Sequence, residues 1–144
     1  MESLIITAED TKGKVKTKGV KYYDGKLWKV FSEYIRRRDA NTDGMVKCYT
    51  CPAVKHWKEL HAGHFVTRTA KAVKFDEKNV QPQCPNCNAF QGGMSYQFGL
   101  NLDRDYGQGT AESLEAQRHS IIKRKPSDYE SLIGLYKEKV ANLD

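Results

Sequence analysis

The sequence contains no apolar run that approaches the roughly 18 residues needed for a membrane-spanning helix. Its first eight residues include Leu-Ile-Ile, but Glu2 precedes this run and no convincing small-residue cleavage site follows, so we expect no signal peptide. The chain also has no internal repeat and no low-complexity tract. These absences disfavour membrane and secreted proteins. They predict a cytoplasmic protein, in which thiols stay reduced and disulfides do not persist.

No cysteine is left over from a regular pattern, because all four lie in two Cys-x-x-Cys pairs, Cys48 with Cys51 and Cys84 with Cys87. Two residues between cysteines let both thiolates face one ion from a tight turn, and two such turns complete a tetrahedral zinc site. A redox dithiol is the rival interpretation, but it would not need a second matching pair. Four thiolates leave zinc no open position for water, so this ion is predicted to be structural.

The 144 residues fit one compact domain. Of these residues, 39% are hydrophobic and 29% are charged, and the formal net charge is +6. This basicity favours an anionic partner, most commonly nucleic acid, although a plain solvated surface is also compatible with it. Residues 11–38 contain ten basic and two acidic residues, a net charge of +8, so the positive charge is concentrated there.

Residues 1–26 are predicted to form a basic N-terminal arm, because the stretch 12–19 alternates lysines with small residues and lacks a helical apolar face. A basic arm suits contacts with DNA phosphates, and a solubilising leader is the alternative. The basic side chains expected to contact DNA in this part of the chain are Lys12, Lys14, Lys16, Lys18, Arg36, Arg37 and Arg38.

Apolar residues spaced three and four apart predict a helix over 27–38, which the turn signal at 41–44 ends. A second helix is expected from Asn88 to about Leu102, weakened near its start by Gly92 and Gly93. A short helix over 110–122 and a last helix after Pro126, with a Ser127–Glu130 capping box, follow. The broad apolar face of the last helix would serve either a homodimer interface or the chain's own core.

Residues 60–68 between the cysteine pairs are interpreted as a strand, whose alternation places His61 and Gly63 on one face and His64 on the other. Pro82 argues against a central strand over 75–83, and Cys84 to Asn88 should open the following helix. The predicted fold is α+β, with helices flanking a small zinc-bearing ββ element.

A histidine on a first strand, an asparagine in the following loop, and an asparagine just after a helix-opening Cys-x-x-Cys resemble the HNH motif, here at His64, Asn79 and Asn88. Residues 62–65, 75–79 and 84–88 more narrowly resemble the phage recombination nucleases of the NinG or Rap family, with a likeness that extends over about 27–143. That family processes branched DNA such as Holliday junctions, D-loops and flaps, in the cytoplasm of the bacterial host.

The resemblance implies a ββα-metal (HNH, His-Me finger) core at 27–104 and a C-terminal helical extension at 105–144. It further implies one catalytic divalent ion, Mg²⁺ or Mn²⁺, which would neutralise charge on the scissile phosphate. His64 would deprotonate the attacking water, Asn88 would bind the ion, and Asn79 would fix the loop and hold the His64 ring.

The sequence departs from the HNH pattern at Gly63, where many HNH sites place an Asp or His metal ligand. His61 lies three residues before His64 and should face away from it on a regular strand. A bulge at Ala62–Gly63 would turn His61 towards the ion, so His61 is the expected second ligand.

Three basic residues near this motif are further candidates. Arg68 is placed to clamp the scissile phosphate, and Lys71 and Lys74 are expected to contact DNA beside it; ordinary surface charge is the alternative for all three. Asp76 and Glu77 are expected to cap a turn rather than to act as acid catalysts.

Two hypotheses of different classes follow. The first is a metal-dependent, structure-selective endonuclease acting on branched or double-stranded DNA, with a homodimer and a recombinase that recruits it as the partners to test. The second is a zinc-knuckle module that binds DNA structures without cutting them. A redox or metal-storage role is a distant third, because the zinc knuckle accounts for every cysteine.

Overall fold

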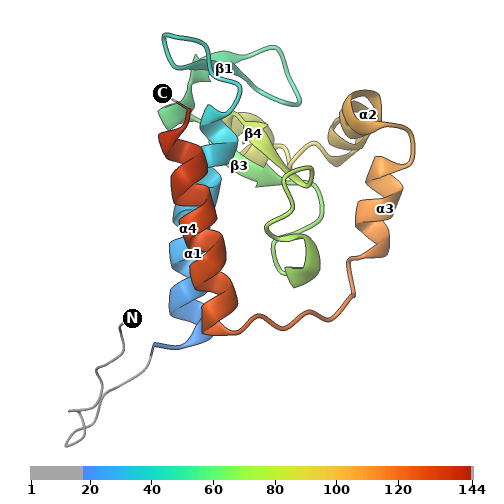
Figure 1. Cartoon of the computed structure of the whole chain (residues 1–144). Helices are drawn as coiled ribbons and strands as arrows, with labels where there is room; N and C mark the ends of the chain where they lie inside the picture. Colours follow the sequence, from blue (N-terminus) through green and yellow to red (C-terminus); the bar gives the residue numbers. More distant parts are fainter. Residues whose placement is uncertain (1–17, 144) are drawn as a thin grey trace, which may run out of the picture.

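The computed structural model describes residues 18–143, in which helices surround two small antiparallel sheets (Figure 1). No helix among these residues is long and apolar enough to cross a membrane. In chain order the helices and strands are α1 (Val20–Arg37), β1 (Met45–Lys47), β2 (Val54–His56), β3 (His61–His64), β4 (Val80–Gln83), α2 (Ser95–Tyr106), α3 (Thr110–Ala116) and α4 (Pro126–Ala141). The fold is thus a mixed α+β fold.

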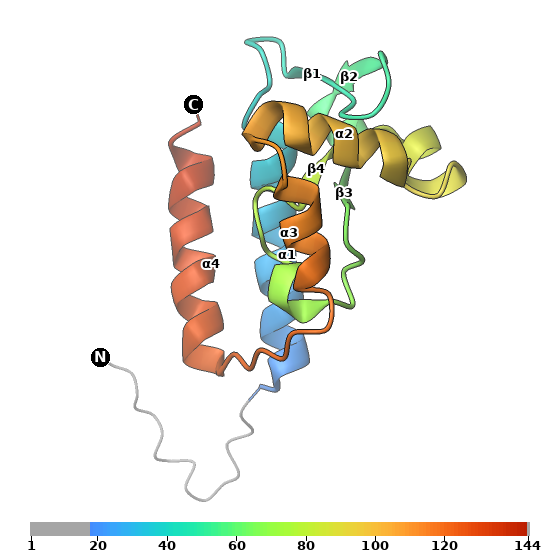
Figure 2. The ribbon, with the colours of Figure 1, turned by 90° about the vertical axis from the view of Figure 1, so that its right-hand side faces the viewer.

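Helices α1 and α4 run side by side in the same direction and form the main core (Figures 1 and 2). Their buried side chains pack together with Val80 of β4, and they are Leu27, Phe31, Ile35, Tyr129, Ile133 and Tyr136. The apolar face of the last helix therefore closes the chain's own core, which was one of the two uses expected for it.

The strands form two separate hairpins, β1 with β2 and β3 with β4. The second pairs His61 with Gln83 and His64 with Val80 in an uninterrupted register, so strand β3 is shorter than the predicted 60–68 and contains no bulge. Pro82 lies inside β4, which is an edge strand and not the central strand that the proline argues against. Both strands of a two-stranded sheet are edge strands, and an edge strand tolerates the missing N–H of proline.

The helix expected from Asn88 to Leu102 is interrupted. A single wide helical turn, η4 (Asn86–Phe90), follows the second cysteine pair, and α2 begins only at Ser95. Gly92, Gly93 and Met94 between them all have positive φ angles, which a continuous helix cannot accommodate. Glycine here ends the first helical segment rather than only weakening it.

Three other helix ends differ from the predictions. Helix α1 begins at Val20, so residues 20–26 of the predicted arm are helical. At the start of α4 the capping carboxylate is Asp128, which accepts a hydrogen bond of 2.8 Å from the Lys125 N–H, in place of the expected Ser127–Glu130 box. Helix α3 ends at Ala116, earlier than the predicted 122.

Helices α2 and α3 lie on the other side of the β3–β4 hairpin from α4 (Figure 1) and build a second core. This core joins Phe98, Leu102 and Leu114 of the helices to Val66 and Val73 of the segment after β3. The segment 65–79 is therefore enclosed between two helical layers, which fixes the surroundings of His64.

We predict that Ile133→Ala lowers the free energy of unfolding by about 2–4 kcal/mol, because it leaves a cavity between α1 and α4. Leu135→Ala is the matched control, since Leu135 is 44% exposed against 6% for Ile133. This control should change the free energy of unfolding by less than about 0.5 kcal/mol. Denaturant unfolding of both variants checks this, and equal effects would contradict the assignment of α4 to the core.

Candidate functional site

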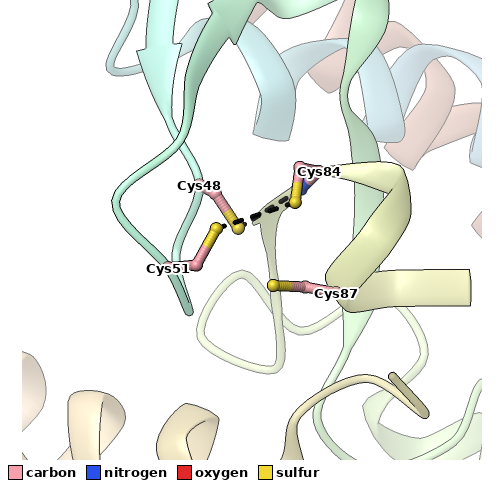
Figure 3. Close-up of side chains that lie close together, drawn as sticks. All are labelled: Cys48, Cys51, Cys84 and Cys87. Carbon is pink, nitrogen blue, oxygen red and sulfur yellow. Dashed lines mark hydrogen bonds between the residues drawn. The ribbon is translucent and has the colours of Figure 1, made fainter. Parts of the chain in front are cut away.

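The four cysteines converge at one point between the two hairpins (Figure 3). Cys48 and Cys51 come from the turn between β1 and β2, and Cys84 and Cys87 come from the end of β4 and the turn η4. Their sulfur atoms all lie within 4.8 Å of one another. This geometry suits one tetrahedral ion, so the cluster can bind the structural zinc that the sequence predicts.

The thiols of this cluster differ in their acidity. Burial is the largest influence on Cys48 and raises its pKa, but hydrogen bonds, among them the one from the Cys84 N–H to its sulfur (3.3 Å), outweigh burial and lower the pKa to about 6. Burial raises the pKa of Cys87 to about 12. A bound cation would favour the thiolate at all four positions, which couples zinc binding to proton release.

His64 is half-buried at the end of β3. Its ring stacks on Trp28 of α1 with a centroid distance of 5.0 Å, and its Nε2 lies 3.1 Å from the Lys74 carbonyl oxygen. A carbonyl can only accept a hydrogen bond, so Nε2 carries the proton and Nδ1 of the neutral ring keeps its lone pair. The contact of Trp28 with His64 was not predicted from the sequence.

Burial lowers the pKa of His64 to about 4, an effect reinforced by the positive charges of Lys74 and Arg68 and opposed by the hydrogen bond to the Lys74 carbonyl. The imidazole is therefore neutral at pH 7. A neutral imidazole can accept a proton, although the lowered pKa makes it a weaker base than an exposed histidine.

Asn79 is fully buried and ties the loop after β3 together. Its Oδ1 accepts from the Val66 N–H at 2.8 Å, and its Nδ2 donates to the carbonyls of Val66 and Val73 at 3.0 Å each. Asn79 thus joins three parts of the loop backbone by hydrogen bonds. The sequence analysis also expected it to hold the His64 ring, but the partner of that ring is the Lys74 carbonyl. The side-chain amide of Asn79 is hydrogen-bonded to backbone groups instead.

Lys74 is anchored to α1. Its ammonium group pairs with the buried carboxylate of Asp24, which also accepts a hydrogen bond of 3.2 Å from the Tyr129 hydroxyl. The Lys74 side chain is 14% exposed. It was expected to face DNA, but the structure commits it to an ion pair that holds the carbonyl under His64. Lys71 is exposed and lies 4.0 Å from the same carboxylate.

A hollow of about 460 Å³ lies beside His64. Its lining includes His64, Asn88 and the exposed Arg68, three residues that the sequence analysis assigned to one site. It also includes Arg118 of the segment after α3, which pairs with Glu115 at 2.9 Å and was missed because its sequence neighbourhood carries no motif.

His61 and Asn88 also meet, at 2.9 Å between His61 Nδ1 and Asn88 Nδ2. The bulge that was expected to turn His61 is absent, and β3 is regular. The contact forms because η4 brings Asn88 back to the edge of β3. An imidazole nitrogen and an amide oxygen are both competent ligands for divalent ions, so the donor set fits the metal that the HNH resemblance implies.

Gly63 lies next to these residues and has no space for a side chain. A Cβ there would overlap Gln83 Oε1 and come within 2.9 Å of Asn88 Oδ1. Gln83 was not singled out by the sequence analysis. The only available signal was its position one residue before Cys84 of the cysteine cluster.

The remaining basic candidates have different surroundings. Lys12, Lys14 and Lys16 lie outside the described residues, and the Lys18 ammonium lies 4.9 Å from the centre of the Tyr22 ring. The guanidinium groups of Arg36 and Arg37 lie over Trp57 at 5.2 and 5.1 Å.

Arg38 does not present its guanidinium to solvent as expected. Its Nη2 donates to the carbonyls of Glu77 and Val80 and to Gln81 Oε1, at 3.0–3.3 Å, and its side chain is 13% exposed. The arginine joins α1 to the start of β4. It therefore has a structural role that a charge pattern alone does not reveal.

We predict that the purified chain holds one zinc ion and that Cys84→Ser removes it, since a serine hydroxyl is a poor zinc ligand. Metal analysis by mass spectrometry measures the content. His56→Gln, a change near the same hairpin but outside the cluster, should retain the ion. Full zinc content in Cys84→Ser would contradict the assignment of the zinc site to the four cysteines.

The lowered pKa of His64 predicts that stability falls as pH decreases from about 6.5 to about 4, because the unfolded chain takes up a proton on this ring before the folded one does. The difference between the free energies of unfolding of wild type and His64→Gln should therefore become smaller over this range. Any loss of zinc at low pH should affect the two proteins alike. An imidazole that titrates near pH 6.5 in NMR spectra would contradict the burial argument.

Comparison with known proteins identifies a family for this chain. The family model of the bacteriophage lambda NinG protein matches residues 7–144. Protein NinG of Escherichia phage 933W is 24% identical over 123 residues, which cover 85% of this chain and 58% of that protein. The NinG proteins of Escherichia phage lambda and Salmonella phage P22 are each 23% identical over 123 residues, 85% of this chain and 57% and 58% of theirs.

The chain thus spans less than two thirds of the length of these relatives. No solved structure shows a significant match to it. Because the family model covers nearly all of the sequence, this chain belongs to the bacteriophage lambda NinG protein family.

Proposed function

We propose that this protein is a divalent-metal-dependent HNH endonuclease that cuts branched DNA. The observation that carries the proposal is the hollow lined by His64, Arg68 and Asn88, in which a neutral imidazole with a fixed tautomer lies near a side-chain amide and an exposed arginine. Family membership supports it, because the HNH likeness of the sequence falls on the same residues.

His64 is the proposed general base. The hydrogen bond from Nε2 to the Lys74 carbonyl leaves Nδ1 as the proton acceptor for a water molecule that attacks phosphorus. Asp24 supports this step indirectly, because its ion pair with Lys74 holds the carbonyl in place. An anionic phosphate in the hollow would raise the pKa of the ring towards its ordinary value and so strengthen the base.

Asn88 would hold the divalent ion, with the neighbouring His61 as the second ligand expected from the sequence. When bound, Mg²⁺ or Mn²⁺ supplies positive charge to the scissile phosphate and the leaving oxygen. Arg68 would add a bidentate contact to the same phosphate, since its guanidinium is exposed at the rim of the hollow.

The substrate class is proposed from the family likeness and the charge. Holliday junctions, D-loops and flaps share a bent phosphate backbone, which a basic surface recognises by shape rather than by base sequence. Symmetric cutting of a four-way junction requires two active sites, so we propose that two copies act together on DNA, recruited by a recombinase.

A DNA-structure-binding module without catalysis is the second candidate. The observation that favours it is the burial of His64 against Trp28, which depresses the basicity that a catalyst at neutral pH would need. Under this alternative the hollow binds a phosphate and nothing is cut.

The deciding experiment measures cleavage of labelled four-way-junction, flap and linear duplex DNA with Mg²⁺ or Mn²⁺. His64→Ala should reduce the rate by at least about 100-fold while DNA binding persists, because only the proton acceptor is lost. His119→Ala is the control and should cut like wild type, since His119 is exposed and outside the hollow. Tight binding without cutting by wild type would favour the second candidate.

A further inference from the structure

The side chain of Gln83, at the end of β4, carries an unusual oxygen. Gln83 is fully buried, and its Oε1 is the one buried side-chain polar atom in residues 18–143 that has no hydrogen-bond partner. A buried amide oxygen without a partner costs about 1–3 kcal/mol. Such an atom requires a functional or structural explanation.

The orientation of this amide is fixed by its nitrogen. Nε2 donates to the Thr50 hydroxyl and to the Gly93 carbonyl, both at 2.9 Å. Rotating the amide by half a turn would place Oε1 against the Gly93 carbonyl oxygen, and two acceptors repel each other. Oε1 is therefore held where it stands.

Oε1 can occupy its position because residue 63 is glycine. A Cβ at Gly63 would overlap Oε1 and would also come within 2.9 Å of Asn88 Oδ1, so both oxygens border one small volume beside β3. His61 Nδ1 lies 2.9 Å from Asn88 Nδ2, and this contact turns the oxygen end of the Asn88 amide towards Gly63.

Two amide oxygens that border the same volume require a positive or hydrogen-donating partner between them. Hard divalent cations prefer such neutral and anionic oxygen ligands. We propose that Gln83 Oε1 is a further ligand of the divalent cation, together with Asn88 Oδ1 and in addition to His61. This inference rests on the proposed metal-dependent function and names an additional residue of the same site.

The proposal also accounts for how the cysteine cluster connects to the candidate site. Thr50, which binds Gln83 Nε2, also contacts Cys48 at 3.6 Å between its Oγ1 and the sulfur. The turn that carries the first cysteine pair thereby sets the position of Oε1. A structural zinc ion would then stabilise a ligand of the second ion without contacting it.

The test is binding of Mn²⁺ to the zinc-loaded full chain, measured by calorimetry and by paramagnetic broadening of side-chain amide signals in NMR spectra. In wild type, substoichiometric Mn²⁺ should broaden the amide signals of Gln83 and Asn88 most strongly. Gln83→Met, which keeps the side-chain length but removes the amide, should weaken Mn²⁺ binding by at least about tenfold. Zinc content and the backbone NMR spectrum report whether this variant is folded.

Gln97→Met is the matched control, because Gln97 is exposed and its amide bonds only within α2, to Asn101. It should leave Mn²⁺ affinity unchanged. A folded Gln83→Met that binds Mn²⁺ like wild type, or wild type that shows no broadening at Gln83, overturns the inference. If Gln83 unfolds the chain when replaced, the wild-type broadening alone decides.

Failure of this inference and failure of the proposed function give different results. Metal-dependent cutting with Mn²⁺ binding that ignores Gln83 would leave the nuclease intact and remove Gln83 from its site. Gln83-dependent Mn²⁺ binding without any cutting would keep the cation site and remove the nuclease.

Discussion

The pairing of β3 with β4 is the constraint on which the candidate site depends. Its register places His61 opposite Gln83 and His64 opposite Val80, residues that are far apart in the sequence. Because side chains alternate between the two faces of a strand, a slip of one residue would move His64 away from Trp28 and remove Gly63 from the oxygen of Gln83. The uninterrupted register also explains why His61 and His64 face different surroundings without a bulge.

Helix α1 supports this hairpin with polar side chains as much as with its apolar face. Asp24 binds Lys74, Trp28 stacks on His64, and Arg38 binds the backbone at the start of β4. These contacts fix three successive parts of the segment between β3 and β4. Helix α4 packs against α1 in the same core, so α1 is held in place by a second helix.

The cysteine cluster supports the other end of the hairpin. Cys84 directly follows β4, and its N–H donates to the sulfur of Cys48 at 3.3 Å. Gln83 is held through Thr50 of the first cysteine turn. A zinc ion bound here would lock the end of β4 and the turn η4 that carries Asn88. Metal binding at the cluster and geometry at the candidate site are therefore mechanically linked.

The sequence by itself determined the features whose signal is local: the two cysteine pairs, the apolar faces of the first and last helices, and the alternation that separates His61 from His64. It also indicated Asn79 as the residue that fixes the loop. Only the tertiary structure decided that Lys74 and Arg38 bind partners inside the protein, that Pro82 lies in an edge strand, and that the Gln83 oxygen faces Gly63. These depend on which atoms surround a side chain after long-range packing, and neither spacing nor periodicity carries that information.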